Sequence, residues 1–246
     1  MNLAHEMLRE LSGRLACLVR GLEQPLQETG YTEVIRGEER EFTHSRFNPK
    51  WMTRLNVEPR VIWDLGSFDG GDALRFSQAF PQGRVLSVEA DPYRFGYVAD
   101  RLAGTRVEVI HSAVCDNDGE VDWLPADEGR DAQGSLYQHT DAYKLRFPSV
   151  KQATHPVRIP STRIDTLCQA YSISQISLLH MDIEGAEHAA LSGLGELRPA
   201  LIWAELCDGR FKGPQRVANT HKLLDGLGYK PVVHLRHDSL YRYCPA

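Results

Sequence analysis

The stretch Val61–Phe76 reads VIWDLGSFDGGDALRF and decides the fold class of this 246-residue chain. An apolar strand pattern ends at Asp64, a loop with three glycines follows, and a helical pattern begins near Asp72. A buried strand, a glycine-rich turn and a helix form the first unit of an open α/β sheet, where backbone N–H groups can meet a nucleotide-like ligand. The stretch therefore predicts an adenosine-bearing cofactor, and the rest of the chain has to decide which one.

Strand and helix patterns alternate along the chain from about residue 60 onward. The next predicted strands are Arg84–Glu89, Val107–His111, Ile176–Met181 and Ala200–Leu206. This alternation predicts a mostly parallel sheet with helices on both faces. Two final apolar segments, Val232–His234 and Leu240–Tyr243, predict a terminal antiparallel pair, which a plain dehydrogenase domain would lack.

We expect the chain to be organised in two parts. Residues 1–58 begin with an amphipathic helix over 3–23 and continue as a polar cap segment. Residues 59–246 form the main α/β domain. They include a polar stretch over 125–156, which interrupts the alternation and is long enough to be a lid-like insertion.

Composition excludes several classes of partner. The net charge is −5, which does not favour a nucleic-acid or an anionic membrane partner. The five cysteines are scattered without a CxxC pair, as expected of free thiols in a reducing cytoplasm. No apolar run approaches the roughly 18 residues that span a bilayer, and no signal peptide is recognised. The apolar stripe of residues 3–23 could pack within the chain or form a homodimer, and both remain open.

The glycine loop Gly66–Gly70 departs from the dinucleotide fingerprint GxGxxG. Phe68 stands at the second glycine and would crowd a pyrophosphate, which Asp64 and Asp69 would also repel. S-adenosylmethionine has no phosphate and carries a sulfonium and an ammonium group, so an acidic loop suits it better than NAD or FAD. We assign to this cofactor the residues Asp64, Gly66, Ser67, Phe68, Asp69 and Gly70.

Further cofactor contacts are expected after the second and third strands. Glu89 closes the second strand, where a carboxylate can accept hydrogen bonds from both ribose hydroxyls, and Ala90 is assigned to the same site. Ser112 and Ala113 follow the third strand and would lie beside the adenine. The pattern predicts a cofactor contact at the end of each of these strands.

The segment LLHMDIEGAEHAAL, residues 178–191, carries the predicted catalytic groups. Asp182 ends the fourth strand and faces the crevice, where it can also contact the cofactor. Either Asp182 or His180 is expected to act as the base or to orient it, with Glu205 or Glu184 assisting. A divalent cation on Asp182, Glu205 and a histidine is an alternative, but no ligand cluster is visible in sequence and no metal residue is assigned.

Six stretches resemble the FkbM family of S-adenosylmethionine-dependent methyltransferases. They are DLGSFDGGDA, SVEADP, SAVCDNDGEV, RIDTL, LLHMDIEGAEHAALSGL and RPALIWAEL. The resemblance implies a seven-stranded Rossmann-like sheet with its last strand antiparallel. It also implies methyl transfer to a hydroxyl of a small molecule such as a polyketide, a sugar or another secondary metabolite, with S-adenosylhomocysteine as the product. His180 departs from the family, which often has a lysine there, and so does the loop Gly66–Asp69.

Two other functions are kept as alternatives. One is a nicotinamide-dependent oxidoreductase on the same fold, against which Phe68 and the terminal antiparallel pair argue. The other is a binding module that holds S-adenosylmethionine without catalysis. The acids Asp64, Glu89 and Asp182 argue against that second alternative.

Overall fold

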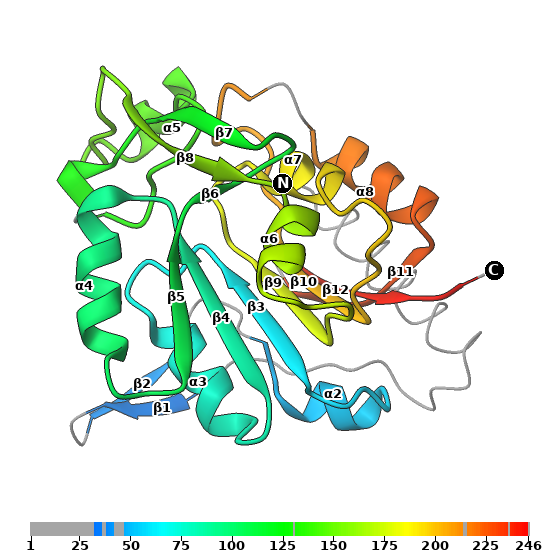
Figure 1. Cartoon of the computed structure of the whole chain (residues 1–246). Coiled ribbons are helices and arrows are strands. Elements are labelled where there is room, and N and C mark those ends of the chain that lie inside the picture. Colours follow the sequence, from blue (N-terminus) through cyan, green and yellow to red (C-terminus); the bar gives the residue numbers. More distant parts are fainter. Residues whose placement is uncertain are drawn as a thin grey trace.

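The computed structural model describes residues 32–35, 38–41, 47–129, 131–213, 216–235 and 237–245 (Figure 1). The predicted helix over residues 3–23 lies outside the described residues. The cap segment contributes two paired antiparallel strands, β1 (Thr32–Ile35) and β2 (Glu38–Glu41), and a short helix, α2 (Lys50–Arg54). Trp51 of α2 is fully buried, with its ring 5.2 Å from that of Trp203. The segment before residue 59 therefore takes part in the core of the main domain.

A seven-stranded sheet forms the centre of the molecule, with the order β11-β12-β10-β9-β3-β4-β5. Its strands are β3 (Val61–Leu65), β4 (Arg84–Glu89), β5 (Val107–His111), β9 (Leu178–Met181), β10 (Leu201–Glu205), β11 (Tyr229–Leu235) and β12 (Asp238–Tyr243). The pairs from β10 through β9, β3 and β4 to β5 are parallel, whereas β12 is antiparallel to both of its neighbours. The predicted mostly parallel sheet and its antiparallel last strand are confirmed.

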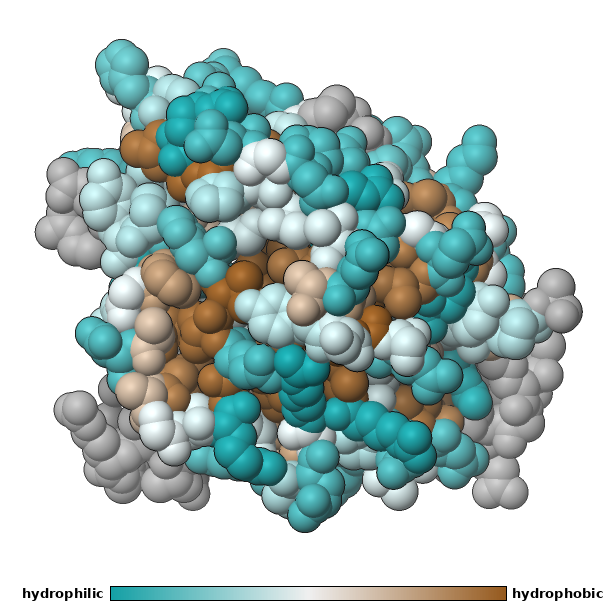
Figure 2. All heavy atoms as spheres, in the orientation of Figure 1, coloured by the Kyte–Doolittle hydropathy of each residue, from teal (hydrophilic) through white to brown (hydrophobic). Residues whose placement is uncertain are grey.

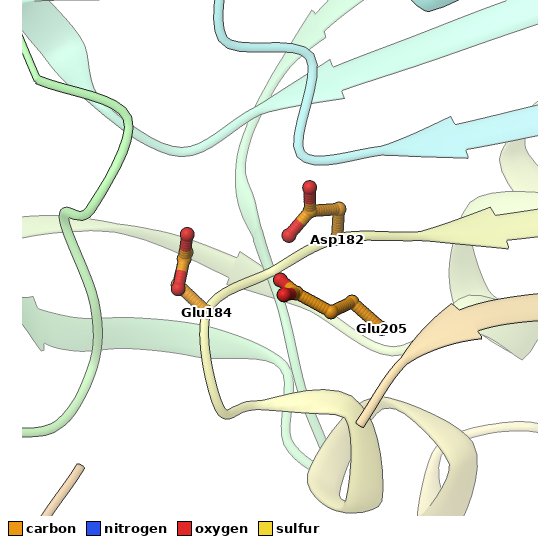
Figure 3. A group of neighbouring side chains, drawn as sticks. All are labelled: Asp182, Glu184 and Glu205. Atoms are coloured by element: carbon orange, nitrogen blue, oxygen red, sulfur yellow. The ribbon is translucent and has the colours of Figure 1, made fainter. Parts of the chain in front are cut away.

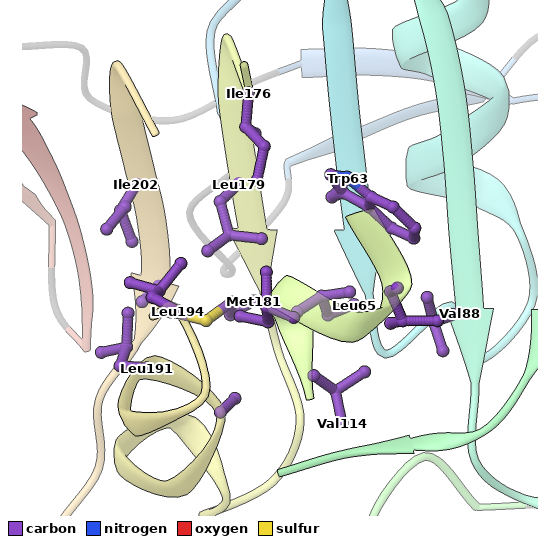
Figure 4. Packing of buried hydrophobic residues seen from close by; sticks show 14 of the residues in the cluster. Trp63, Leu65, Val88, Val114, Ile176, Leu179, Met181, Leu191, Leu194 and Ile202 are labelled. Atoms are coloured by element: carbon purple, nitrogen blue, oxygen red, sulfur yellow. The ribbon is translucent and has the colours of Figure 1, made fainter. Parts of the chain in front are cut away.

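Helices cover both faces of the sheet, because successive strand residues point to opposite sides. Trp63 and Leu65 pack on one face in a large apolar cluster with α6, α7 and α8 (Figure 4). Ile62 points to the other face, where Phe76 and further residues of α3 and α4 cover it. These helices are α3 (Gly71–Ala79), α4 (Pro92–Leu102), α6 (Ile164–Ala170), α7 (Glu187–Ser192) and α8 (Val217–Gly226). Each fully buried large apolar side chain stabilises the fold by about 1.5–3 kcal/mol, so the two clusters fix the sheet between its helices.

A second, three-stranded sheet lies beside the carboxyl ends of β4 and β5 (Figure 1). Its order is β6-β8-β7, with β6 (Ala113–Val114) parallel and β7 (Gly119–Trp123) antiparallel to β8 (Val157–Thr162). Ala113, Trp123 and Ile159 form a small apolar cluster on it. This sheet begins directly after β5. It therefore takes the place of the helix that would continue the alternation of strands and helices.

The 125–156 insertion contains regular elements and is tied to its surroundings. It includes a short 3-10 helix, η1 (Asp127–Gly129), and the helix α5 (Asp141–Arg146), whose first turn Thr140 caps through the N–H of Tyr143. Isolated β-bridges join Leu124 to Ser135, Ala126 to Gln152 and His139 to Phe211. The insertion thus packs against the loop after β10 at one end and against the strand β7 at the other. Its role as a lid stays a prediction.

Hydrophilic side chains cover most of the face that Figure 2 shows. Apolar residues are visible between α4 and α6, over β4 and β5 (Figure 2), where every residue of the edge strand β5 is only partly buried. Among the helices that the structure describes, none has the length and apolar character needed to cross a bilayer.

Candidate active site

A cavity opens at the carboxyl ends of β3, β4 and β9. The loop after β3, the end of β4, the start of β6 and the loop after β9 line it, and residues 131–136 of the insertion cover one side. The carboxyl edge of a parallel sheet is where open α/β folds bind ligands, as the sequence predicts here.

Gly66 shapes the floor of the cavity and tolerates no side chain. Its φ is +89°, and a Cβ atom built on it would lie 1.9 Å from the carbonyl oxygen of Asp182. The N–H groups of Gly66 and Ser67 donate to the carbonyl of Val88, at 3.0 and 3.2 Å. The glycine loop is therefore held between β4 and β9, in backbone contact with the segment that carries the predicted catalytic acid.

Glu89 lies under the loop with both carboxylate oxygens hydrogen-bonded. The N–H of Phe68 donates to Oε2 at 2.6 Å and that of Asp91 donates to Oε1 at 2.8 Å. Burial raises the pKa of Glu89 to about 7, although both N–H donors favour the carboxylate. A carboxylate has about four acceptor positions, so two remain for the hydroxyl groups of a ribose.

A polar network supports the loop from the opposite face of the sheet. His180 Nδ1 lies 2.6 Å from Asp64 Oδ1, and the Ser87 hydroxyl lies 3.0 Å from Asp64 Oδ2 and 2.7 Å from the Ser67 hydroxyl. Asp64 is fully buried, and the His180 ring packs edge-on against Phe76. This network lies beneath the loop, outside the cavity lining, so Asp64, Ser67 and His180 support the site from below.

The far wall of the cavity comes from β6, β7 and the insertion. The Ser112 hydroxyl is engaged with the Thr162 hydroxyl at 2.9 Å, so it faces β8 as well as the cavity. The indole N–H of Trp123 donates to Asp91 Oδ2 at 3.2 Å, and a Cβ on Gly134 would lie 2.6 Å from the Trp123 ring. No local motif marks Trp123 and Gly134, because only the second sheet and the insertion bring them to the cavity.

Three carboxylates meet at the other end of the cavity and point toward one another (Figure 3). They are Asp182 after β9, Glu184 two residues later and Glu205 at the end of β10, and one oxygen from each lies within 4.8 Å of the others. We call these three residues the acid cluster. Their spacing would allow them to share a cation.

Arg210 supplies a positive charge to the acid cluster. Its guanidinium Nη2 donates to Glu205 at 3.0 Å, and its Nη1 pairs with Glu184. Burial alone would lower the pKa of Arg210, but Glu184 and Glu205 raise it above its usual value, so the guanidinium stays charged. Arg210 lies in the loop after β10, five residues beyond Glu205, and no sequence motif marks it.

Asp182 is the exposed member of the acid cluster, whereas Glu184 and Glu205 are partly buried. The Asp182 side chain is exposed to the cavity, but protein surrounds the carboxylate on its other sides. This desolvation, followed by the charges of Glu184 and Glu205, raises the pKa of Asp182 well above its usual range. A carboxylate with a raised pKa, open to a ligand cavity, is suited to accept a proton.

Glu187 shapes the backbone that carries the acid cluster. Its carboxylate accepts the N–H groups of Ile183 and Gly185, at 3.2 Å each. Burial raises the pKa of Glu187 to about 7. These two hydrogen bonds account for an acid at position 187 better than the dipole of α7 does, since Glu187 contacts the loop before the helix.

The structure brings part of the predicted site together. The predicted residues that line the cavity are Gly66, Phe68, Glu89, Ala90, Ser112, Ala113, Asp182 and Glu184, with Glu205 in the acid cluster. Those outside the lining are Asp64, Ser67, His180, Gly70 and Asp69. Asp69 forms an ion pair with Arg101 at 2.6 Å and Gly70 caps α3 in a left-handed conformation, so both act on the outer side of the loop.

Comparison with known proteins identifies one family. The model of the methyltransferase FkbM domain matches residues 64–231. The 2-O-methyltransferase NoeI of Sinorhizobium fredii (strain NBRC 101917 / NGR234) is 27% identical over 203 residues, which cover 78% of this chain and 79% of that protein. Methyltransferase 1 of Beauveria bassiana (strain ARSEF 2860) is 26% identical over 188 residues, covering 70% and 73%. Among solved structures, a methyltransferase from Geobacter sulfurreducens matches with a TM-score of 0.43 and 15% identity, covering 82% and 80%.

Proposed function

This chain belongs to the FkbM family of S-adenosylmethionine-dependent methyltransferases, and we propose that it transfers the methyl group to a hydroxyl of a small molecule. The observation that carries this proposal is the position of Asp182. Its carboxylate is open to the same cavity as the glycine loop and Glu89. One cavity therefore contains both a base for the acceptor and the residues that would bind the cofactor.

The cavity suits a cationic cofactor that contains ribose. Glu89 retains acceptor positions for ribose hydroxyls, and Ala113 would lie beside the adenine. Asp182 and Glu184 line the other end, where their negative charge would attract the sulfonium. When bound, S-adenosylmethionine supplies a methyl group that is already activated toward nucleophiles.

Asp182 is the base in this proposal. An acceptor hydroxyl that becomes an ether loses its proton, and the Asp182 carboxylate, which is exposed to the cavity and has a raised pKa, is suited to receive it. His180 was the other candidate; its imidazole is engaged with Asp64 beneath the loop. It acts here as a support for the loop. Much of the remaining acceleration comes from holding the hydroxyl oxygen about 3 Å from the methyl carbon.

The acceptor class rests on similarity and on the chemistry of the base. NoeI is a 2-O-methyltransferase, and the two sequences align over most of both chains. A carboxylate with a raised pKa fits a hydroxyl acceptor, which must lose a proton. We propose a polyketide, a sugar or another secondary metabolite as the acceptor.

Incubation with methyl-labelled S-adenosylmethionine and an extract of the source cells tests this function. We expect one labelled small-molecule ether, which mass spectrometry would identify. Thermal-shift measurements provide the control, with S-adenosylhomocysteine expected to stabilise the protein and NAD expected to have no effect. Stabilisation by NAD alone would support the oxidoreductase alternative. Binding of S-adenosylhomocysteine without any transfer would support the binding module.

We propose that transfer does not depend on a divalent cation. Metal-assisted transfer would place a cation on the acid cluster, but the Arg210 guanidinium already pairs with Glu184 and Glu205. Turnover is expected to survive exhaustive chelation followed by gel filtration. Loss of turnover that added Mg²⁺ restores would contradict this part of the proposal.

A further inference from the structure

Arg210 holds two members of the acid cluster in place. Its contacts with Glu184 and Glu205 use both terminal nitrogens, with a further contact of 3.4 Å from Nη1 to Glu205 Oε2. The Arg210 side chain is 16% exposed, that of Glu184 11% and that of Glu205 20%. Carboxylates this close in a poorly solvated site repel one another, so a cation between them is needed to keep them together.

Asp182 is the member of the cluster that Arg210 leaves free. Within the described residues it forms no ion pair, whereas Glu184 and Glu205 share the guanidinium. Its carboxylate remains within 4.8 Å of the other two and faces the cavity. Arg210 therefore contacts two carboxylates of the cluster, and the third, Asp182, is hydrogen-bonded to Glu205 and faces the cavity.

The backbone of Arg210 is attached to the insertion. The N–H of Thr140 donates to the Arg210 carbonyl at 2.9 Å, and its hydroxyl donates to the Gly209 carbonyl at 2.6 Å. The N–H of Lys212 donates to the Gln138 carbonyl at 2.6 Å. These bonds join residues 138–140 to residues 209–212, which are about seventy positions apart in the chain.

Side chains of the insertion, together with the neighbouring Phe211, complete the enclosure of the guanidinium. The rings of Tyr143 and Phe211 have centroids 5.9 and 6.0 Å from the guanidinium carbon. The Ser135 hydroxyl donates to the Glu184 carbonyl at 2.6 Å. The insertion thus holds both partners of the Arg210–Glu184 pair, one through its backbone and ring contacts and the other through Ser135.

We infer that Arg210 is a positioning residue for methyl transfer, which bridges Glu184 and Glu205 and so leaves Asp182 as the carboxylate that receives the acceptor proton. This inference rests on the proposed function. The planar guanidinium can bridge two carboxylates at fixed distances, which an ammonium group cannot do with the same geometry. An error of about 1 Å in the placement of reacting groups can lower a rate about 100-fold.

Kinetics of Arg210→Gln, Arg210→Lys and Arg210→Ala in the full chain test the inference, with the acceptor that the labelling experiment identifies. We expect kcat to fall about 100-fold in the glutamine and alanine variants and about tenfold in the lysine variant. Cofactor affinity, measured by calorimetry, should stay within about threefold of wild type in all three. Millimolar guanidinium chloride should restore part of kcat in Arg210→Ala and leave wild type unchanged.

Arg163 provides the matched control. It makes a two-point contact with Asp165, at 2.7 and 2.9 Å, outside the cavity lining. Arg163→Gln should keep the kcat of wild type, and guanidinium should not affect it. If Arg210→Gln has the same kcat as wild type, the inference is overturned. An equal loss of cofactor affinity and of kcat in this variant would overturn it too.

A variant that fails to fold does not end the test. Removing one partner of a buried ion pair can cost about 3–5 kcal/mol, which Arg210→Gln could show as unfolding. Arg210→Lys keeps the charge, and a kcat of wild type in it would overturn the inference. A wild-type protein without any methyl transfer contradicts the proposed function and this inference with it. An active wild type with equally active Arg210 variants contradicts the inference alone.

Discussion

The two ends of the cavity are formed by different kinds of chemical groups. The cofactor end consists of Gly66, Phe68, Glu89 and Ser112–Ala113, which come from consecutive strand ends and are held by backbone hydrogen bonds. The acceptor end consists of the acid cluster and Arg210, whose side chains come from two strand ends and a loop that the insertion holds. Backbone geometry fixes the first end, whereas a balance of charges fixes the second. Substitutions should therefore damage the two ends in different ways.

Gly66→Ala should have the largest effect, because Gly66 joins the two ends. Its Cβ would overlap the Asp182 carbonyl oxygen at 1.9 Å, and its φ of +89° disfavours any side chain. We expect loss of more than about 4 kcal/mol of unfolding free energy together with loss of cofactor binding. Urea denaturation and calorimetry measure both quantities.

Gly96→Ala is the control for this prediction. Gly96 lies within α4, and a Cβ atom there would meet nothing within 4 Å. Alanine favours helix over glycine by about 0.5–1 kcal/mol, so this variant should be as stable as wild type or more stable. Cofactor binding by Gly66→Ala at wild-type strength would show that the two ends are not joined in this way.

Asp182→Asn should impair the acceptor end and leave the cofactor end intact. Asparagine keeps the shape of the side chain but cannot accept the acceptor proton. We expect kcat to fall about 10²–10⁴-fold, with little change in the dissociation constant of S-adenosylhomocysteine. In wild type, the raised pKa of Asp182 should make activity increase with pH until the carboxylate is fully ionised. If calorimetry finds affinity and turnover reduced equally, Asp182 belongs to the cofactor end instead.

Glu89 and Glu187 place one buried carboxyl with a raised pKa at each end, so stability should fall as pH rises. Each pKa is about 7 in the folded chain against 4.5 in the unfolded chain. The folded chain therefore holds protons between pH 4.5 and 7 that the unfolded chain has released. Between pH 4 and pH 8, the ionisation of each group should lower the free energy of unfolding by about 3 kcal/mol at most.

The glutamine variants of these two residues distinguish the ends. Glu89→Gln and Glu187→Gln should each flatten the dependence of urea stability on pH between 5 and 8, since glutamine does not titrate. Of the two, Glu89→Gln should also weaken cofactor binding, because Glu187 contacts the Ile183 and Gly185 backbone outside the cavity lining. Equal weakening of cofactor binding in both variants would contradict this division.

Asp69→Asn should have the smallest effect, although the sequence suggested Asp69 as a cofactor residue. The structure pairs it with Arg101 on the outer side of the loop, where the Asp69 side chain is 45% exposed. Exposed ion pairs contribute about 0–1 kcal/mol. Cofactor affinity should stay within about threefold of wild type, and a loss of tenfold or more would return Asp69 to the cofactor end.

Local sequence was sufficient for the sheet and for most of the cofactor end. The βα units could be recognised because each strand is an apolar run and each ends in a turn signal, as in Val61–Gly66 and Arg84–Glu89. The same rule identified Asp182 and Glu205, since the carboxyl ends of parallel strands meet at one edge. It did not show which way each side chain points, so Asp64 and His180 were assigned to a cavity that they support from below.

The sequence by itself determined the order of strands and helices, the glycine loop and the acids at the strand ends, because each depends on residues within a few positions of one another. Only the tertiary structure decided that Trp123 and Gly134 close the cofactor end and that Arg210 neutralises the acid cluster. The bond from Trp123 to Asp91 spans 32 positions, and that from Arg210 to Glu184 spans 26. The pairing of β7 with β8 and the bonds between Thr140 and residues 209–210 create them, and no local pattern encodes either.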